Sequence, residues 1–154
     1  MGSNSDLVTM KEAINTLRKF GLNFDVNIIS AHRSPEKVQS YAKGAEKKYE
    51  AIIAGAGGAA HLAGVIASLT PIPVIGVPML TAGLGGLDSL LSMVQMPSGV
   101  PVATVAVGGA KNAGILAIQI LGTSDDNVLN KLILYKKSLA EESKRKNENP
   151  AFTK

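Results

Sequence analysis

The chain has 154 residues, of which 45% are hydrophobic but only 4% aromatic, and it contains no cysteine. This length allows a full hydrophobic core in one domain, and the lack of cysteine excludes disulfides and thiolate metal sites. Two histidines are few for a histidine-rich metal site, so we expect no metal. No apolar run is long enough to span a membrane and no signal peptide opens the chain, so we expect a cytoplasmic protein without a membrane partner.

The net charge of +4 is concentrated at one end of the chain. Residues 131–154 hold seven Lys or Arg against three Glu, and the charges of the other residues cancel. A charge run of this kind is typical of a solvated helix face. The alternative is a basic stripe for RNA or DNA, but no aromatic platform accompanies it, so we expect no nucleic-acid partner.

Helices and strands alternate along the predicted chain, with short connections between them. The first predicted helix has apolar residues at helical spacing and stops at Gly21, and the second starts with a Ser34 cap and Pro35. The predicted helices cover residues 7–20, 35–49, 59–69, 87–96, 112–121 and 126–146, and the predicted strands cover residues 24–29, 51–54, 74–77 and 102–107.

This alternation predicts a doubly wound parallel α/β fold. We expect a single domain over residues 1–146, including the C-terminal helix, and a frayed tail over residues 147–154. The helix at 112–121 has almost no polar face, so we expect it to be buried or at an interface. The core must be built from small aliphatic residues, and the excess of apolar surface favours an oligomer.

The most informative motif is SAHRSP at residues 30–35, which follows a predicted strand and opens a helix. Open parallel sheets bind their ligands at the carboxyl ends of strands. His32 can transfer protons near neutral pH, and the guanidinium of Arg33 beside it suits an anion such as a phosphate. A structural histidine and a surface ion pair are the alternatives.

Two further loops are candidates for ligand binding. GSNSD at residues 2–6 offers hydroxyls, backbone N–H groups and a carboxylate, which form either a phosphate site or a helix cap, or both. GAGGAAHL at residues 55–62 lacks bulky side chains over its first positions, so a ligand can lie against its backbone. Tight packing between a strand and a helix is the other interpretation of this loop. It matches neither a Walker loop nor a dinucleotide fingerprint.

Taken together, these motifs resemble class I N5-carboxyaminoimidazole ribonucleotide mutases of purine biosynthesis. The matching segments cover nearly all of residues 2–122 in the family's order. They are GSNSD, SAHRSP, IIAGAGGAAHL, PVIGVP, GLDSLLSMVQMPSGVPVATVAVG and AKNAGILAIQIL. Class II relatives, which carboxylate aminoimidazole ribonucleotide with CO2, carry Lys-Gly where this chain has Arg33 and Ser34, so class I is favoured.

The resemblance implies a flavodoxin-like three-layer fold, a homo-octamer and a reaction on a ribonucleotide that needs no cofactor, metal or ATP. The carboxylate would move from the exocyclic nitrogen to ring carbon 4, with His32 as the general acid and base. CO2 would be held near Ala59, Ala60, His61 and Leu62. The implied substrate-binding residues are Ser3, Ser5, Asp6, Ser30, Arg33, Gly57, Gly58, Ala59, His61 and Leu62.

Three features depart from the family's pattern. The family has a central strand before the GSxSD loop, and without it the neighbouring strands lack ladder partners. The family also has proline at Ala63, and its loop at residues 108–111 is longer by about two residues. The alternatives to the mutase are a related carboxylase that acts on aminoimidazole ribonucleotide or another ribonucleotide with CO2, and an inactive, truncated homologue.

Overall fold

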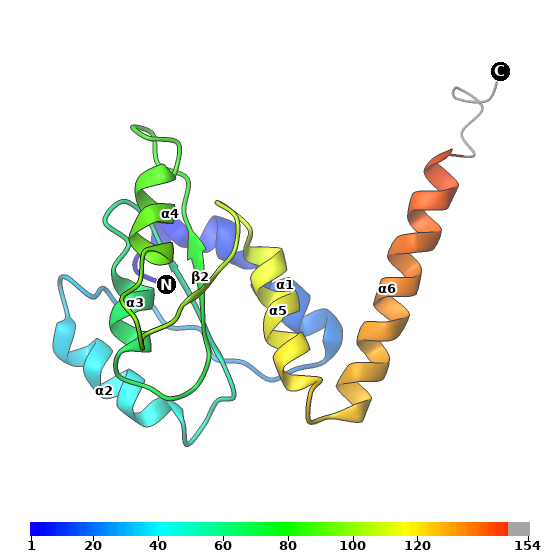
Figure 1. Ribbon diagram of the computed structural model, residues 1–154, viewed down its shortest axis with the longest axis horizontal. Helices are drawn as coiled ribbons and strands as arrows, with labels where there is room; N and C mark the ends of the chain where they lie inside the picture. Colours follow the sequence, from blue (N-terminus) through cyan, green and yellow to red (C-terminus); the bar gives the residue numbers. More distant parts are fainter. Residues whose placement is uncertain (148–154) are drawn as a thin grey trace. The chain divides into compact units, whose positions relative to one another are not determined.

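A parallel three-stranded sheet lies at the centre of the first part of the chain (Figure 1). In this computed structural model, which describes residues 1–147, the strands are β1 (Ile52–Ala56), β2 (Val74–Pro78) and β3 (Ala103–Thr104), in that order. β1 pairs with β2 from Ile52 opposite Val74 to Ala56 opposite Pro78. β1 is buried at all but one position and β2 at every position, because helices cover the sheet.

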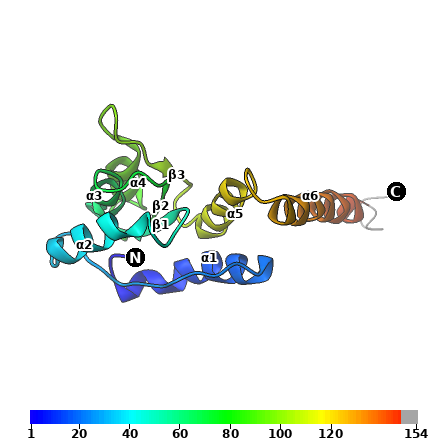
Figure 2. The same ribbon diagram turned by 90° about the horizontal axis from the view of Figure 1, so that it is seen from below.

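Helices flank this sheet on both sides. Figure 2 shows α3 (Leu62–Ala67) and α4 (Leu87–Val94) on one side and α1 (Leu7–Phe20) on the other. α2 (Pro35–Ala45) packs beside α3. The core between this helix layer and the sheet is formed mainly by small aliphatic residues, as the composition predicts. The doubly wound parallel α/β architecture is thereby confirmed.

The predicted first helix is confirmed as α1. Its buried residues Met10, Ala13 and Phe20 recur at helical spacing. The preceding turn η1 (Asn4–Asp6) has a capping box, and the helix ends at Gly21, whose φ of 74° is left-handed. α1 packs closely against α5 (Ala110–Leu121). A Cβ atom added to Gly114 of α5 would lie only 3.1 Å from the Cβ of Thr16 of α1.

The predicted strand at residues 24–29 is wrong, because this segment has no regular structure. Within residues 1–147 its backbone bonds to Met1. Asn27 O accepts from the Met1 amino group at 2.8 Å and Ile29 N donates to Met1 O at 2.9 Å. Two such bonds at one end of the segment do not make a ladder, so strand propensity alone does not produce a strand here. Tyr49 O–H donates to Asp25 at 2.6 Å, and this bond raises the pKa of Tyr49 to about 12.

Other predicted elements form with different bounds. β3 has two residues where the pattern predicted six, α2 ends at Ala45, and α3 begins at Leu62 instead of residue 59. The helix predicted at residues 112–121 forms as α5. Most of its first eight residues, up to Ala117, are buried, which confirms that prediction.

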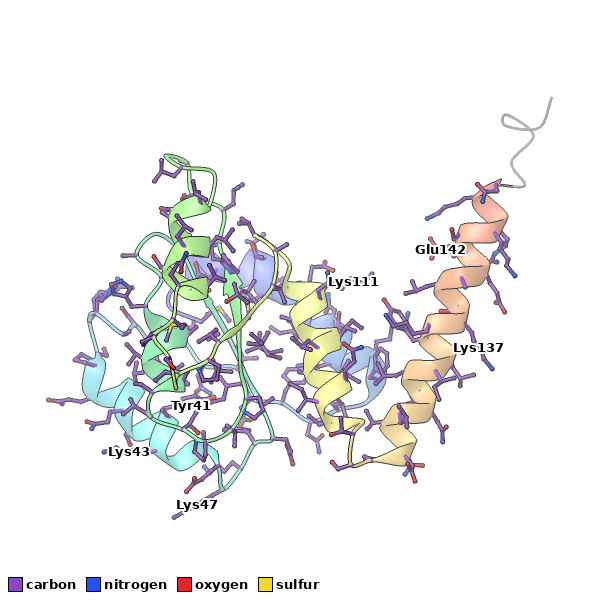
Figure 3. The ribbon with its side chains drawn as sticks, in the orientation of Figure 1. Tyr41, Lys43, Lys47, Lys111, Lys137 and Glu142 are labelled. Atoms are coloured by element: carbon purple, nitrogen blue, oxygen red, sulfur yellow. The ribbon has the colours of Figure 1, made fainter. Side chains whose placement is uncertain are left out.

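The chain forms two compact units, Met1–Ala117 and a second unit that begins at Ile118. The prediction of one domain over residues 1–146 therefore stays a prediction. In the second unit, α6 (Asp126–Asn147) is capped by Asp125, whose carboxylate accepts from Asn127 N at 2.8 Å. The lysines of α6 are exposed, and Figure 3 shows Lys137 and Glu142 projecting from it.

This exposure agrees with a solvated face but equally with a basic stripe, so the solvated-face interpretation stays a prediction; residues 148–154 of the predicted tail lie outside the described residues. Among residues 1–147, no helix has the length and apolar character needed to cross a bilayer.

Candidate active site

The residues singled out in three separate loops meet in one cleft of about 490 Å³. The cleft lies in the first unit, at the carboxyl ends of β1 and β2, where parallel sheets of this class bind ligands. All the predicted site residues except Gly58 and Ala60 line it. The cleft is lined by Gly2, Ser3, Ser5, Asp6, Ser30, Ala31, His32, Arg33, Ala56, Gly57, Ala59, His61, Leu62, Met79 and Leu80.

Met79 and Leu80 are lining residues that the sequence reasoning missed. They follow Pro78, the last residue of β2. The sequence could have indicated them, because residues that follow a strand parallel to β1 lie at the same edge of the sheet as the residues that follow β1. Leu80 is 75% exposed, so the cleft has an apolar rim as well as polar walls.

The first loop presents hydroxyls around a buried carboxylate. Asp6 is only 9% exposed, and one of its oxygens accepts from Ser3 N at 3.0 Å. Ser5 Oγ lies 2.9 Å from Ser3 Oγ. The loop is therefore a helix cap and a polar binding surface at once, as the sequence allowed, because the same groups serve both purposes.

Arg33 links the second loop to the first. Its Nε donates to Ser30 Oγ at 3.3 Å, and its terminal nitrogen lies 3.5 Å from the carbonyl oxygen of Gly2. The Arg33 backbone N–H also donates to Ser30 Oγ at 3.3 Å. The guanidinium is thus held over the serine-rich loop, where a fixed cation and several hydroxyls suit a phosphate.

His32 and His61 come together from segments 29 residues apart. Nε2 of His32 lies 2.9 Å from Nδ1 of His61, and the two rings meet edge to face at 80°. Both side chains are exposed to the cleft, and neither has a metal-binding set around it. Within residues 1–147 no three His, Cys, Asp or Glu side chains gather as metal ligands.

The glycine loop after β1 leaves its backbone open to the cleft. A Cβ on Gly57 would lie 3.2 Å from the Cβ of Met79, so a side chain there would crowd the floor of the site. Gly58 has a left-handed φ of 66° and does not line the cleft. Its N–H instead donates to Ser89 Oγ of α4 at 2.9 Å, which holds the loop from behind.

Ser89 is a second residue whose role the sequence did not reveal. It is fully buried, and its hydroxyl lies beneath the glycine loop. Ser92, one turn later, lies 3.4 Å from Gly58 O and donates to Asp88 O at 2.7 Å. Two serines three residues apart, on a helix whose only other polar residue is Asp88, were the available signal.

The family model described as AIR carboxylase matches residues 1–142. The chain is 58% identical over 152 residues to the N5-carboxyaminoimidazole ribonucleotide mutase of Pyrococcus horikoshii, an alignment that covers 98% of this chain and 84% of that protein. It is 56% identical over 143 residues to the mutase of the same name from Thermotoga maritima, covering 92% and 84% of the two chains. It is also 56% identical to the chloroplastic phosphoribosylaminoimidazole carboxylase of Vigna aconitifolia over 142 residues, which are 92% of this chain and 26% of that protein.

A solved structure supports the same assignment. The crystal structure of Treponema denticola PurE superposes with a TM-score of 0.88 at 27% identity, covering 97% of this chain and 94% of that one. The fold is thus flavodoxin-like, as the resemblance implied. The match to the family model and the identities above 50% along most of the chain show that this chain belongs to the AIR carboxylase family.

Proposed function

We propose that this chain is an isomerase, an N5-carboxyaminoimidazole ribonucleotide mutase of purine biosynthesis. It would move the carboxylate from the exocyclic nitrogen N5 to ring carbon 4, giving 4-carboxy-5-aminoimidazole ribonucleotide. The observation that carries the proposal is the cleft, in which His32, the serine-rich loop and the glycine loop meet. Relatives that bear the mutase name share more than half of the aligned residues.

The ribonucleotide is oriented by the polar end of the cleft. Ser3, Ser5, Ser30 and Arg33 bind the phosphate, and the buried Asp6 carboxylate accepts from the ribose hydroxyls. Such groups place the base without taking part in the chemistry, and fixed geometry of this kind supplies a large share of a rate enhancement. The aminoimidazole ring then lies over Gly57, where the lack of a side chain leaves room for it.

His32 carries the proton in both halves of the proposed reaction. Its imidazolium protonates the exocyclic nitrogen as the bond from that nitrogen to the carboxyl carbon breaks, which releases CO2 and leaves His32 neutral. Ring carbon 4 then forms a bond to the carbon of CO2, and neutral His32 removes the proton from carbon 4. One proton is given and one is recovered, so no ATP, metal or cofactor enters the balance.

The CO2 formed between the two steps has to stay in the site. Ala59, His61 and Leu62 line the cleft beside the glycine loop, and Ala60 lies buried between them at 1% exposure. The alanine and leucine side chains of this wall suit CO2, which has no net dipole. Retaining CO2 also avoids the entropic cost of recapturing it from solution.

A carboxylase that uses free CO2 is the second candidate. It is favoured by the description of the family and by the plant relative named as a carboxylase. Arg33 and Ser34 stand where class II enzymes have Lys-Gly, which supports the mutase instead. The third possibility, an inactive homologue, predicts an intact cleft without turnover.

In the test of this proposal, the protein is incubated with N5-carboxyaminoimidazole ribonucleotide without ATP or added bicarbonate, and the formation of the carbon-carboxylated isomer is measured. We expect turnover by the unmodified chain and a loss of at least about 10²-fold in kcat for His32→Asn, since that variant has no proton to give or take. A parallel incubation with aminoimidazole ribonucleotide and bicarbonate tests the carboxylase.

Turnover in the second incubation alone would contradict the mutase and establish the carboxylase. No turnover in either, by protein with a cooperative unfolding transition, would mean an inactive homologue or a different ribonucleotide. His32→Asn as active as the unmodified chain would remove His32 from the mechanism while leaving the activity intact.

We also propose that the chain works in the cytoplasm as a homo-octamer. Exposed apolar side chains support self-association in each unit. Leu87, Leu91 and Val94 form one stripe of α4 and are 51%, 45% and 49% exposed, and Leu129, Ile133 and Leu134 of α6 are 43%, 44% and 65% exposed. A second copy of the chain would bury such surfaces.

A further inference from the structure

The two histidines of this chain form one unit. The sequence contains only His32 and His61, and the structure joins them by a contact of 2.9 Å between Nε2 of His32 and Nδ1 of His61. The contact leaves one nitrogen of each ring outside it, namely Nδ1 of His32 and Nε2 of His61. Because both rings line the cleft, the way in which they share hydrogens decides which nitrogen of His32 can act on a substrate.

A hydrogen bond between two imidazoles requires one N–H and one lone pair. Either Nε2–H of His32 donates to Nδ1 of His61, or Nδ1–H of His61 donates to Nε2 of His32. In the first arrangement Nδ1 of neutral His32 is a free base. In the second, neutral His32 carries its hydrogen on Nδ1, and its only lone pair is already used by His61.

Only the first arrangement survives a change in the protonation of His32. A neutral His32 donates through Nε2–H, and an imidazolium donates through the same N–H while a second proton sits on Nδ1. The bond to His61 is unchanged in both states. In the second arrangement, a proton added to Nε2 of His32 would meet the N–H of His61 and break the pair.

We propose that His61 is a positioning residue for His32, the acid–base group. Nδ1 of His61 accepts a hydrogen bond from Nε2–H of His32, and Nδ1 of His32 is therefore the nitrogen that carries the catalytic proton. This inference rests on the proposed function. It assigns His61 a role through His32, in addition to its place beside the CO2 pocket.

The backbone on both sides of the pair is held in place. His61 N donates to Ala59 O and His61 O accepts from Val65 N, each at 2.9 Å. On the other side, Ser34 N donates to Ser30 O at 2.9 Å and closes the turn that carries His32. The backbone that carries each ring is therefore held by hydrogen bonds on both sides of the pair.

A neutral imidazole is a suitable partner for a group that must both give and take a proton. A carboxylate behind a histidine stabilises its imidazolium strongly. His61 orients the ring by a hydrogen bond but adds no negative charge beside it. The other charged side chains that line the cleft, Asp6 and Arg33, are bonded to Ser3 and Ser30 respectively.

The first test measures tautomers and does not depend on turnover. With 15N-labelled histidine, the chain shows four ring nitrogens, two from each residue. At a pH where both rings are neutral, we expect Nε2 of each ring to bear hydrogen and both Nδ1 atoms to be unprotonated. In His61→Leu, His32 should show the mixed tautomers of a free imidazole. Hydrogen on Nδ1 of His32 in the unmodified chain would overturn the proposal.

The second test uses matched variants of His61 in the mutase assay. The side-chain oxygen of asparagine can replace Nδ1 as an acceptor, whereas leucine cannot. We expect His61→Leu to lower kcat about 10- to 100-fold with KM within about threefold, the range seen for residues that orient a functional ligand. His61→Asn should recover most of the lost kcat.

Equal effects of the two variants, or a raised KM with unchanged kcat, would show that His61 contacts the substrate only and would overturn the proposal. If the unmodified chain has no turnover, the proposed function fails, while the nitrogen spectra still decide whether the pair exists. Both side chains are exposed, so neither variant removes core packing.

Discussion

Ser89 supports the active-site loop from a position that no ligand reaches. Its hydroxyl is fully buried and accepts from the N–H of Gly58. Ser89→Ala removes this acceptor and leaves a backbone N–H without a partner, which costs about 1–3 kcal/mol. We expect a fall of that size in the free energy of unfolding, measured with urea, and a raised KM because the loop loses its position.

Ser92→Ala is the matched control, one turn further along α4. Its hydroxyl donates to Asp88 O within the helix and lies at the limit of bonding to Gly58 O. The loss should stay below about 1 kcal/mol, since no buried N–H becomes unpaired. Equal effects from the two serines would contradict a specific role for Ser89.

At the scale of elements, the turn between β2 and α4 depends on one glycine more than on its neighbours. Gly86 has φ of 87°, and a Cβ there would lie 2.5 Å from Val107 Cγ1 and 3.0 Å from Met79 O. Gly85 has φ of 60° but open space around it, and Gly83 has open space and no positive φ. Substitutions at these three positions therefore distinguish the effect of steric overlap from the effect of backbone strain.

Alanine substitutions should fall in a graded order. Gly83→Ala should change the free energy of unfolding by less than about 1 kcal/mol, in either direction. Gly85→Ala should cost about 1–2 kcal/mol for the left-handed backbone. Gly86→Ala adds overpacking of about 1–3 kcal/mol to the same strain. Urea unfolding of the three variants measures the order, and a Gly85 variant as damaged as Gly86→Ala would contradict the steric argument.

The contacts of residues 22–30 show how an irregular segment is held in place without the hydrogen-bond ladder of a β-sheet. The Tyr49 hydroxyl just past α2 reaches the Asp25 carboxylate, and the backbone of Asn27 and Ile29 meets Met1. These contacts bring SAHRSP to the edge of the sheet even though no strand precedes it. The loop is thus placed by side-chain and terminal contacts more than by strand pairing.

For the whole molecule, the proposed octamer predicts a particle eight times the 16.0 kDa mass of the chain. Sedimentation equilibrium measures this mass directly. Leu91→Glu puts a charge in the middle of the apolar stripe of α4, so we expect it to shift the protein to smaller species. Burying an unpaired charge in an interface costs several kcal/mol.

Val8→Glu is the control, because Val8 is 79% exposed on α1 and stands outside that stripe. It should leave the mass unchanged. A monomer at every concentration would contradict the octamer, and equal dissociation by both variants would contradict the assignment of the interface to α4.

The active site is likewise a property of the whole first unit. Three loops far apart in the sequence meet at the carboxyl end of β1, where Gly2 N donates to Gly55 O at 2.9 Å and Ile29 N donates to Met1 O at 2.9 Å. Only the glycine loop follows a strand, so it was the resemblance to the mutase family that predicted a shared site for Ser3, His32 and Gly57. It was not enough to predict Met79, which no motif marks, or that the N–H of Gly58 turns away toward α4.

What the sequence determined by itself was the order of the helices and of the other three strands, the family and most of the site. Helical spacing in α1, the apolar runs of β1 and β2, and the loops GSNSD, SAHRSP and GAGGAAHL are local signals, and each survives in the structure. Only the tertiary structure decided three things: the absence of a strand at residues 24–29, the burial of Ser89 under Gly58, and the contact of His32 with His61. Each depends on a partner distant in the chain, and a local pattern of residues does not specify that partner.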